Sequence, residues 1–473
     1  MSNSPILWSA SDIKSVFPSA AILPDDWSAT GISFDSRTLA QGDLFFAIKT
    51  PQSDGHRYIK DAISKGAAAL VVDHIPDGLS SDTPLIQVAD TLRALEDLGK
   101  ARRAQFAGHV IAITGSAGKT STKDGMAIAL DDQKKVFKAP SSYNNYLGVP
   151  YSLASLPKEA DVAIFEVGMN HSGEIRPLTK IIRPHTAVIT CVETAHIGNF
   201  KGIEQIAEAK SEILEGLAPG GTAILNRDTN CYNILETAAC SAKANIITFG
   251  ESAACDIKMT SYEAFPPKVT VTYQGTPYTY NLGVYGKLQA MNTLAILGAC
   301  VELGIDTHNA LSKLVQYHGT TGRGVHHEIT LPQGKITVID ESYNASNTAA
   351  IKMALEVLAH IPKTSGRRIA VLGDMVKEEQ TPETHASLAD PIANTEIDQV
   401  HTCGPLMKHL YDKLPERYKG MDFNNVEESI IPILDSLQAN DTIMVKGALS
   451  SRMGTLVQAI LAQDTKLTRS TQA

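Results

Sequence analysis

Apolar residues follow two alternating patterns along this chain. Short apolar runs bounded by glycine, proline or polar residues are typical of buried strands, whereas apolar residues that recur every three or four positions indicate helices. In the first hundred residues, 44–48 and 67–72 are expected strands, and 58–65 and 91–106 are expected helices. This alternation predicts a small α/β domain.

A second domain begins with the apolar run 108–113. The expected strands that follow are 162–167, 187–191 and 222–225, and the expected helices are 203–217, 290–303 and 310–317. Strands that alternate with helices predict a mostly parallel sheet covered by helices. Polar and apolar residues alternate over 268–280, which predicts additional antiparallel strands in this domain.

A glycine-rich segment, 319–324, is the expected linker to a third domain. Its expected strands are 336–339, 368–372, 399–402 and 442–445, with helical patterns between them. This order predicts a doubly wound, Rossmann-like sheet, and the absence of a G-x-G-x-x-G motif argues against a dinucleotide. The sequence thus predicts an α/β protein with domains at 1–107, 108–318 and 319–473.

Composition narrows the class of protein. A chain of 473 residues with 43% hydrophobic and 20% charged residues is typical of a globular protein with several domains. A net charge of -9 argues against a general nucleic-acid binder. The six cysteines lack C-x-x-C spacing, and no apolar run approaches the length of a membrane span. We therefore expect a cytoplasmic protein with reduced thiols, no membrane span and, by default, a monomeric state.

The segment Ile111–Lys123, I-A-I-T-G-S-A-G-K-T-S-T-K, carries the clearest chemical signal. A strand that enters a glycine-containing turn and then a helix exposes backbone N–H groups to phosphate oxygens. The usual P-loop has a glycine where Ile113 stands, so the glycine spacing here is short. The alternative is an ordinary strand–turn–helix junction. The expected phosphate-binding residues are Gly115, Ser116, Ala117, Gly118, Lys119, Thr120 and Ser121.

Three residues further along are candidates for chemistry near this loop. Glu166 and His196 follow expected strands, and carboxyl ends of parallel strands are where ligands bind in such sheets. Glu166 is therefore a candidate Mg²⁺ ligand, and His196 a candidate for a second metal or for phosphate. Lys210 lies on an amphipathic helix. The alternatives are an exposed strand-end acid, a loop histidine and a solvated lysine.

The third domain offers candidates at its strand ends. Asp340 and Asn344 follow the strand 336–339, Lys446 follows the strand 442–445, and Arg323 lies in the glycine-rich linker. Arg323 could reach phosphate from a hinge. Each position could equally be a plain strand–loop junction. Their occurrence together, however, favours a ligand-binding site at this edge of the sheet.

Motifs in all three expected domains resemble those of the Mur ligases of bacterial cell-wall synthesis. The first domain has F-D-S-R at 34–37 and D-G-H at 54–56, and the central domain has T-G-S-A-G-K-T-S-T and Y-N-N-Y-L-G-V-P. The third domain has I-D-E-S-Y-N-A and V-L-G-D-M, which resemble the member that adds D-alanyl-D-alanine. The D-N-P-R stretch of the diaminopimelate-adding member is absent.

The resemblance implies an ATP-dependent ligase that forms an amide through an acyl phosphate. Its implied substrates are UDP-N-acetylmuramoyl-tripeptide, held by the first domain, and D-alanyl-D-alanine, held with an edge of the nucleotide by the third. The central domain would bind ATP and two Mg²⁺ ions. Lys119 would contact the β- and γ-phosphates, Thr120 and Glu166 would hold one Mg²⁺, and His196 and a carbamylated Lys210 would hold the second.

The remaining roles implied by the resemblance concern nucleotide and substrate. Asn145 would lie near the phosphates, and Arg323 would reach the γ-phosphate after domain closure. Asn292 and Asp340 would contact the adenosine. The implied substrate-binding residues are Ser36, Arg37, Asn344 and Lys446.

The chain departs from the family pattern at Leu288, where a histidine is common, and at Ala448, where a serine is common. Neither position belongs to the P-loop or to the implied metal ligands, so an active enzyme is expected. The alternatives are the neighbouring diaminoacid-adding ligase, a non-catalytic nucleotide-sugar-binding relative and a general P-loop ATPase.

Overall fold

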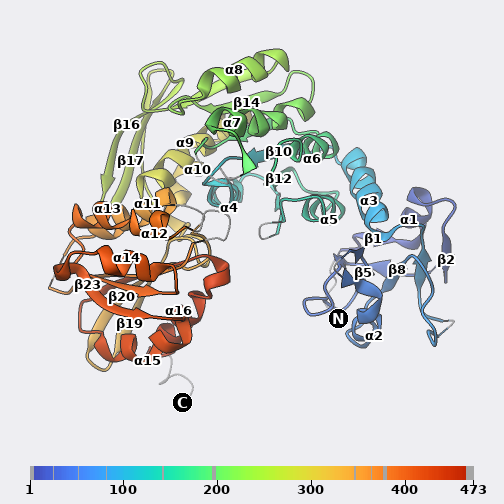
Figure 1. Cartoon of the computed structure of the whole chain (residues 1–473). Helices are drawn as coiled ribbons and strands as arrows, with labels where there is room; N and C mark the ends of the chain where they lie inside the picture. The colour runs from blue at the N-terminus through green and yellow to red at the C-terminus, as the bar shows by residue number, and fades with distance from the viewer. Residues whose placement is uncertain are drawn as a thin grey trace.

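The computed structural model describes residues 5–24, 26–51, 53–80, 82–140, 143–193, 199–345, 348–363, 365–375 and 381–464. Figure 1 shows an arch, in which the N-terminal and C-terminal parts lie at opposite ends of a central part. A large sheet forms the middle of each part. Within the described residues, no helix has both the length and the apolar character needed to cross a bilayer.

The N-terminal sheet has the strand order β2-β9-β8-β5-β4. Its strands are β2 (Ala21–Leu23), β4 (Gly31–Ser33), β5 (Asp43–Phe46), β8 (Ala69–Val72) and β9 (Leu85–Gln87). The helices are α1 (Ala10–Val16), α2 (Ile59–Ser64) and α3 (Thr91–Gln105), and the two small ribbons pair β1 (Trp8–Ser9) with β3 (Ser28–Ala29) and β6 (Lys49–Thr50) with β7 (Ser53–Asp54). Because β4, β5, β8 and β9 are parallel, their following loops share one edge of the sheet.

The central sheet has nine strands in the order β11-β12-β10-β13-β14-β15-β16-β17-β18. They are β10 (His109–Thr114), β11 (Val136–Lys138), β12 (Val162–Glu166), β13 (Thr186–Ile189), β14 (Thr222–Asn226), β15 (Asn245–Gly250), β16 (Ile257–Ala264), β17 (Pro267–Tyr273) and β18 (Thr276–Asn281). All neighbours are parallel up to β16, and β16, β17 and β18 are antiparallel. The expected antiparallel strands are confirmed.

Helices cover both faces of the central sheet. They are α4 (Lys119–Leu130), α5 (Gly148–Ala154), α6 (Ile175–Ile182), α7 (Ile203–Ser211), α8 (Tyr232–Ser241), α9 (Lys287–Glu302) and α10 (Thr307–Ser312). Alternate residues of β10 explain this arrangement, because Ile111 and Ile113 pack into one apolar core and Val110 and Ala112 into another. The central strands are therefore buried on both faces, as their continuous apolar runs predict.

One expected helix was too long. The segment 203–217 is helical only over α7, and a 3₁₀ turn, η3 (Glu212–Gly216), continues it. Glu212 is buried at this junction and accepts hydrogen bonds from the backbone N–H groups of Gly173 (2.7 Å) and Arg176 (3.0 Å). These tertiary bonds cap the start of α6.

The C-terminal sheet has the order β19-β20-β24-β21-β22-β23. Its strands are β19 (Val325–Leu331), β20 (Gly334–Glu341), β21 (Arg368–Gly373), β22 (Gln399–Cys403), β23 (Lys419–Phe423) and β24 (Thr442–Lys446). Its helices are α11 (Thr348–His360), α12 (Pro382–Ala386), α13 (Ala389–Ala393), α14 (Met407–Lys413), α15 (Val426–Ser436) and α16 (Gly454–Leu461). The expectation that this part begins with the strand 336–339 was wrong, because β19 precedes it as an antiparallel edge strand. The doubly wound α/β class is confirmed.

Candidate active site

The glycine-containing loop connects β10 to α4 at the carboxyl end of the central sheet (Figure 1). Gly118 has a φ of 82°, and a Cβ added there would lie 2.5 Å from Oδ1 of Asn292. A Cβ at Gly115 would lie 1.9 Å from Oγ1 of Thr190. The two glycines therefore allow both the turn and its close packing against neighbouring elements.

Hydrogen bonds to the segment after β13 hold the loop in place. The Ser116 backbone N–H donates to the Cys191 carbonyl (2.9 Å), and the Ser116 hydroxyl donates to the Glu193 carbonyl (2.9 Å). The Thr190 hydroxyl donates to the Ala117 carbonyl (2.5 Å). The first amides of α4 have no acceptor inside the helix, so the loop presents ready donors to an anion.

Lys119 is the first residue of α4, and its Nζ donates to the Gly115 carbonyl at 2.8 Å. The side chain thus folds back over the loop, where its ammonium adds positive charge to the anion-binding turn. Burial lowers the pKa of Lys119, the nearby Glu166 carboxylate raises it, and Arg323 lowers it further. A bound phosphate would place negative charge beside Lys119 and so stabilise the ammonium form of its side chain.

Thr120 and Glu166 form an oxygen-donor pair beside the loop. Thr120 Oγ1 donates to Glu166 Oε2 at 2.8 Å, and Asn144 Nδ2 donates to Glu166 Oε1 at 2.7 Å. Glu166 ends β12, which pairs in parallel with β10, and the residue is 2% exposed. A hydroxyl and a carboxylate at this position are suitable ligands for Mg²⁺.

Asn144 was missed by the sequence reasoning, which selected Asn145. The Asn145 side-chain oxygen accepts from the backbone N–H groups of Leu147 (3.1 Å) and Gly148 (2.9 Å) at the start of α5. The signal for Asn144 was its position in the same polar turn, but only the fold brings its amide to Glu166.

Asn292 projects from α9 against the loop. It is 3% exposed, and its Nδ2 has no hydrogen-bond partner among the described residues. An unpaired buried amide costs about 1–3 kcal/mol. A ligand at the Gly118 turn could accept this hydrogen bond.

Lys210 lies in the last turn of α7 and is only 4% exposed. Burial lowers its pKa to about 7, and the positive charge of Lys119 contributes to the shift. The Cys191 side chain has a smaller, opposite effect. A substantial fraction of Lys210 is therefore uncharged near neutral pH, as a reactive amine requires. His196, the other candidate for this region, lies outside the described residues.

The linker candidates meet where the central part joins the C-terminal part. The Arg323 guanidinium lies over the Tyr343 ring, 4.6 Å from its centroid. The buried Asp340 carboxylate accepts from the Gly322 backbone N–H (2.8 Å) and from the Ser342 hydroxyl (2.6 Å). Asp340 therefore fastens the linker to the end of β20 in this structure.

Asn344 and Lys446 meet at the same edge of the C-terminal sheet. Lys446 ends β24 and is buried, and its Nζ donates to the Asn344 carbonyl (2.8 Å) and to Glu341 Oε2 (3.2 Å). The Asn344 side chain is exposed. The ammonium is thus held at the strand end by neighbours on β20 and its following loop.

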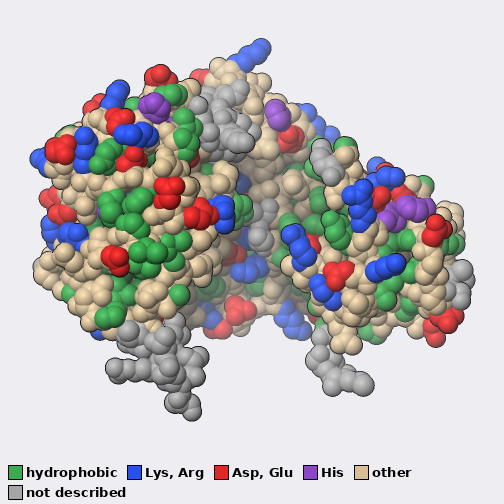
Figure 2. Space-filling model, turned by 60° about the horizontal axis from the view of Figure 1, so that its bottom comes forward, with side chains coloured by type: hydrophobic (Ala, Val, Ile, Leu, Met, Phe, Trp, Pro, Cys, Tyr) green, Lys and Arg blue, Asp and Glu red, His purple; other side chains and the backbone are tan. Residues whose placement is uncertain are grey.

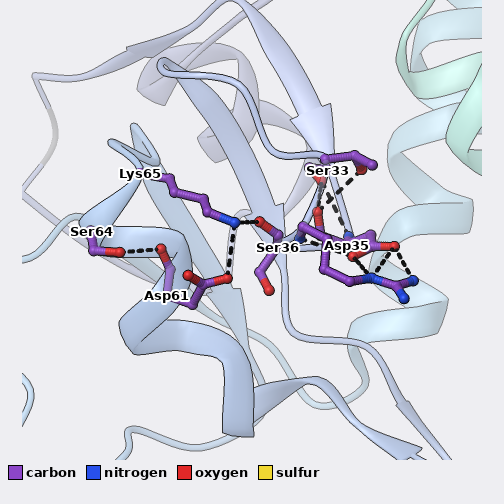
Figure 3. A network of polar contacts seen from close by, with 8 residues as sticks. Ser33, Asp35, Ser36, Asp61, Ser64 and Lys65 are labelled. Carbon is purple, nitrogen blue, oxygen red and sulfur yellow. Dashed lines mark hydrogen bonds and ion pairs between the residues drawn. The ribbon is translucent and has the colours of Figure 1, made fainter.

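Ser36 and Arg37 lie in the loop after β4, and their surroundings differ. Figure 3 shows Ser36 beside Lys65. Ser36 is buried, and its carbonyl accepts from Lys65 Nζ at 2.6 Å, while Lys65 also contacts Asp61 at 3.2 Å. The Arg37 side chain is 85% exposed and is paired with Asp35 at 2.6 Å. Arg37 is therefore accessible to an anionic ligand.

An aromatic cluster joins this loop to the central part. Phe34 makes edge contacts with Tyr143 (5.7 Å between ring centroids) and Tyr151 (5.1 Å). Trp8 Nε1 also donates to the Ala154 carbonyl at 2.8 Å. These contacts fix the N-terminal loop beside the segment that carries Asn144. Figure 2 shows a hollow between the N-terminal and C-terminal parts of the molecule.

Three family models match the chain. The model described as Mur ligase family, catalytic domain, matches residues 28–103, Mur ligase middle domain matches 113–300, and Mur ligase, glutamate ligase domain, matches 328–449. These ranges contain the P-loop, Glu166, Lys210 and Lys446.

Similar proteins match over almost the whole chain. The UDP-N-acetylmuramoyl-tripeptide–D-alanyl-D-alanine ligase of Rickettsia prowazekii is 33% identical over 430 residues, which cover 90% of this chain and 94% of the relative. The Escherichia coli enzyme of the same name is 30% identical, with 92% and 94% covered. A crystal structure of MurF from Acinetobacter baumannii has a TM-score of 0.82 at 28% identity and covers 96% of this chain and 99% of its own. The resemblance predicted from the motifs is confirmed, and the chain belongs to the Mur ligase family.

Proposed function

We propose that this protein is an ATP-dependent ligase that adds D-alanyl-D-alanine to UDP-N-acetylmuramoyl-tripeptide in peptidoglycan precursor synthesis. The observation that carries this proposal is the assembly of Lys119, Thr120, Glu166 and Lys210 in a chain that matches ligases of that name over 90–92% of its length. The MurF ligase of Thermotoga maritima has been solved in complex with ADP, and it shares this fold at 24% identity and a TM-score of 0.75, covering 92% of this chain and 97% of its own.

The nucleotide would bind at the loop before α4. The loop amides and Lys119 would hold the β- and γ-phosphates, because both offer positive charge to the same point. Thr120 and Glu166 would hold Mg²⁺, which neutralises charge on the phosphates as the phosphoryl group moves. The unpaired amide of Asn292 and the strand-end Asp340 are proposed to contact the adenosine, and Asn145 to lie near the phosphates.

Lys210 is proposed to be carbamylated and to hold a second Mg²⁺ together with His196. Carbamylation joins the neutral amine nitrogen to the carbon of CO₂ and releases one proton. A pKa of about 7 makes this neutral amine available. The resulting carboxylate would also remove the positive charge that Lys210 otherwise places near Lys119.

Catalysis would proceed through an acyl phosphate. The terminal carboxylate of the tripeptide attacks the γ-phosphorus, ADP leaves, and the carboxyl carbon becomes electrophilic. The amine of D-alanyl-D-alanine then attacks that carbon, loses a proton and expels phosphate. Arg323 is proposed to stabilise charge on the transferred phosphoryl group, and closure of the parts would protect the acyl phosphate from water.

The parts of the chain are proposed to divide this work. Residues 1–107 would bind the UDP moiety through Ser36 and Arg37, residues 108–318 would bind ATP, and residues 319–473 would bind D-alanyl-D-alanine near Asn344 and Lys446. We further propose that the enzyme acts as a monomer in the cytoplasm.

A phosphate-release assay tests the proposal. Release should require ATP, Mg²⁺, UDP-N-acetylmuramoyl-tripeptide and D-alanyl-D-alanine together. Release without an acceptor would instead indicate a general ATPase, and binding of ATP and substrate without turnover would indicate a non-catalytic relative.

A further inference from the structure

A compact group of two histidines and an aspartate lies outside the proposed active site. Asp73 and His74 directly follow β8, and His56, the last residue of the D-G-H motif, lies in the 3₁₀ turn η1 (Gly55–Tyr58). One ligand atom from each residue lies within 4.8 Å of the other two, and no other such group of His, Cys, Asp and Glu occurs among the described residues. The proposed ligase reaction gives these three residues no role.

The geometry already approaches that of a metal site. Asp73 Oδ1 lies 3.1 Å from His56 Nε2 and also contacts His74 Nδ1. The two imidazole rings are stacked, with 4.2 Å between their centroids and 21° between their planes. Ligand atoms about 2.0–2.2 Å from a tetrahedral Zn²⁺ lie about 3.3–3.6 Å from one another. Because an imidazole binds a metal in its ring plane, the exposed His74 ring would have to turn out of the stack to bring its Nδ1 onto an ion shared with His56.

A second carboxylate orients the buried histidine. Asp54 Oδ1 lies 2.7 Å from His56 Nδ1 and also accepts the His56 backbone N–H at 3.0 Å. The His56 side chain is only 6% exposed, so its ring is fixed. Metal-binding histidines commonly donate their other ring N–H to a carboxylate in this way, which keeps the ligating nitrogen unprotonated.

The contacts around His56 Nε2 leave a charge to be balanced. The Asp73 backbone N–H approaches this nitrogen at 3.3 Å and requires its lone pair as acceptor. With Nδ1–H donated to Asp54, the Asp73 carboxylate oxygen at 3.1 Å faces the same lone pair. Two acceptors at this distance repel each other unless a proton on Nε2 or a metal ion lies between them.

We propose that His56 Nε2, Asp73 and His74 Nδ1 bind a divalent transition-metal ion of the Zn²⁺ class, with Asp54 as the orienting carboxylate. Two imidazoles and one carboxylate suit Zn²⁺ and Co²⁺ better than Mg²⁺, which prefers oxygen ligands throughout. Because the His74 side chain is 56% exposed, the site opens to solvent and leaves a coordination position for water. The site lies at the same edge of the N-terminal sheet as the Ser36 loop.

Calorimetric titration of the full, chelator-treated chain with Zn²⁺ tests the site without turnover. A large excess of Mg²⁺ in the buffer occupies the oxygen-rich positions near Glu166. The wild type should bind one more Zn²⁺ than His74→Gln, or bind it at least about 100-fold more tightly, because a direct ligand is lost. Asp54→Asn should weaken binding about 10–100-fold.

His171→Gln is the matched control, since His171 is also exposed and also contacts a carboxylate, Glu174 at 2.9 Å, outside the group. It should bind Zn²⁺ like the wild type. Co²⁺ should give the visible absorption of a four-coordinate nitrogen–oxygen site in the wild type and not in His74→Gln, while thermal unfolding confirms that each variant is folded. Equal Zn²⁺ affinity and stoichiometry in the wild type and His74→Gln would overturn the proposal, as would the absence of Zn²⁺ binding to the wild type.

Discussion

At the scale of single residues, the proposed active site contains two buried lysines whose positive charges repel each other. Burial lowers the pKa values of both Lys119 and Lys210. The charged form of each lysine is therefore destabilised unless an anion binds beside it. Phosphate is the natural partner of Lys119, and CO₂ is the proposed partner of Lys210.

Lys119→Ala should lower the rate of phosphate release by at least about 100-fold, because it removes a positive charge from the transferring phosphoryl group. Thermal unfolding should change little, since the one hydrogen bond of Lys119 Nζ among the described residues is to the Gly115 carbonyl of its own loop. Lys180→Ala, on the exposed side of α6, is the control and should keep full activity. Turnover by Lys119→Ala at the wild-type rate would refute the phosphate assignment.

Lys210 gives a prediction about pH and bicarbonate. As the pH falls through about 7, Lys210 becomes protonated and can no longer hold CO₂, so activity should fall and added bicarbonate should partly restore it. Lys210→Ala should be nearly inactive and should recover activity with short carboxylic acids that replace the carbamate. A folded Lys210→Ala variant that no acid rescues would count against carbamylation.

The sequence indicated the strand-end residues of the site but not their contacts. Glu166 could be predicted because a parallel strand ends there beside a glycine-rich loop. Asn144 could not be distinguished from Asn145, since both lie in one polar turn and only tertiary packing selects the amide that reaches Glu166. The spacing of apolar residues along the helix also could not predict that Lys210 is buried, because helix lysines are usually solvated.

At the scale of elements, the glycine-rich linker 319–324, which precedes β19, is strongly constrained by backbone geometry. Gly322 has a φ of 76°, and a Cβ there would lie 2.5 Å from the Tyr343 Cβ. Gly322 also donates to Asp340, so the turn, the Arg323–Tyr343 contact and the end of β20 form one unit.

Gly322→Ala should therefore reduce both stability and turnover. Gly275→Ala is the matched control, because Gly275 has a similar φ of 78° and open space around its Cβ position. The control should cost about 1 kcal/mol in the free energy of unfolding and leave kcat unchanged. Gly322→Ala should cost more and lower kcat several-fold, measured by urea unfolding and phosphate release. Equal effects of the two substitutions would contradict the hinge assignment.

Strands that are buried on both faces could be predicted from the sequence, whereas the two edge strands of the C-terminal sheet could not. β10, β12, β13 and β14 are buried on both faces and appear as continuous apolar runs. β19 and β23 lie at the edges of the C-terminal sheet and are only partly buried, so their polar residues concealed them. Hydrogen bonding to the neighbouring strand, rather than the local pattern of apolar and polar residues, stabilises these two strands.

At the scale of the whole molecule, buried histidines link stability to pH. Burial lowers the pKa values of His109, His326 and His401 to about 4, while exposed histidine titrates near 6.5. Above pH 6.5 these residues are neutral in both the folded and the unfolded protein. Between pH 6.5 and 4 the unfolded protein binds more protons, so the folded protein loses stability as the pH falls.

Urea unfolding at several pH values should show this loss, by up to about 1.4 kcal/mol per pH unit for each histidine. His109→Gln should make the pH dependence shallower, because one group with a lowered pKa is lost. A pH dependence that is identical in the wild type and His109→Gln would show that His109 is not held neutral by the fold.

The choice of amine acceptor tests the central claim most directly. The enzyme is given ATP, Mg²⁺, both UDP-N-acetylmuramoyl-dipeptide and UDP-N-acetylmuramoyl-tripeptide, and an equal mixture of D-alanyl-D-alanine and diaminopimelate, and the products are identified by mass. The expected result is one product, the tripeptide precursor extended by D-alanyl-D-alanine, with one phosphate released for each amide formed. A dipeptide precursor extended by diaminopimelate, or phosphate release without any amide product, would contradict it.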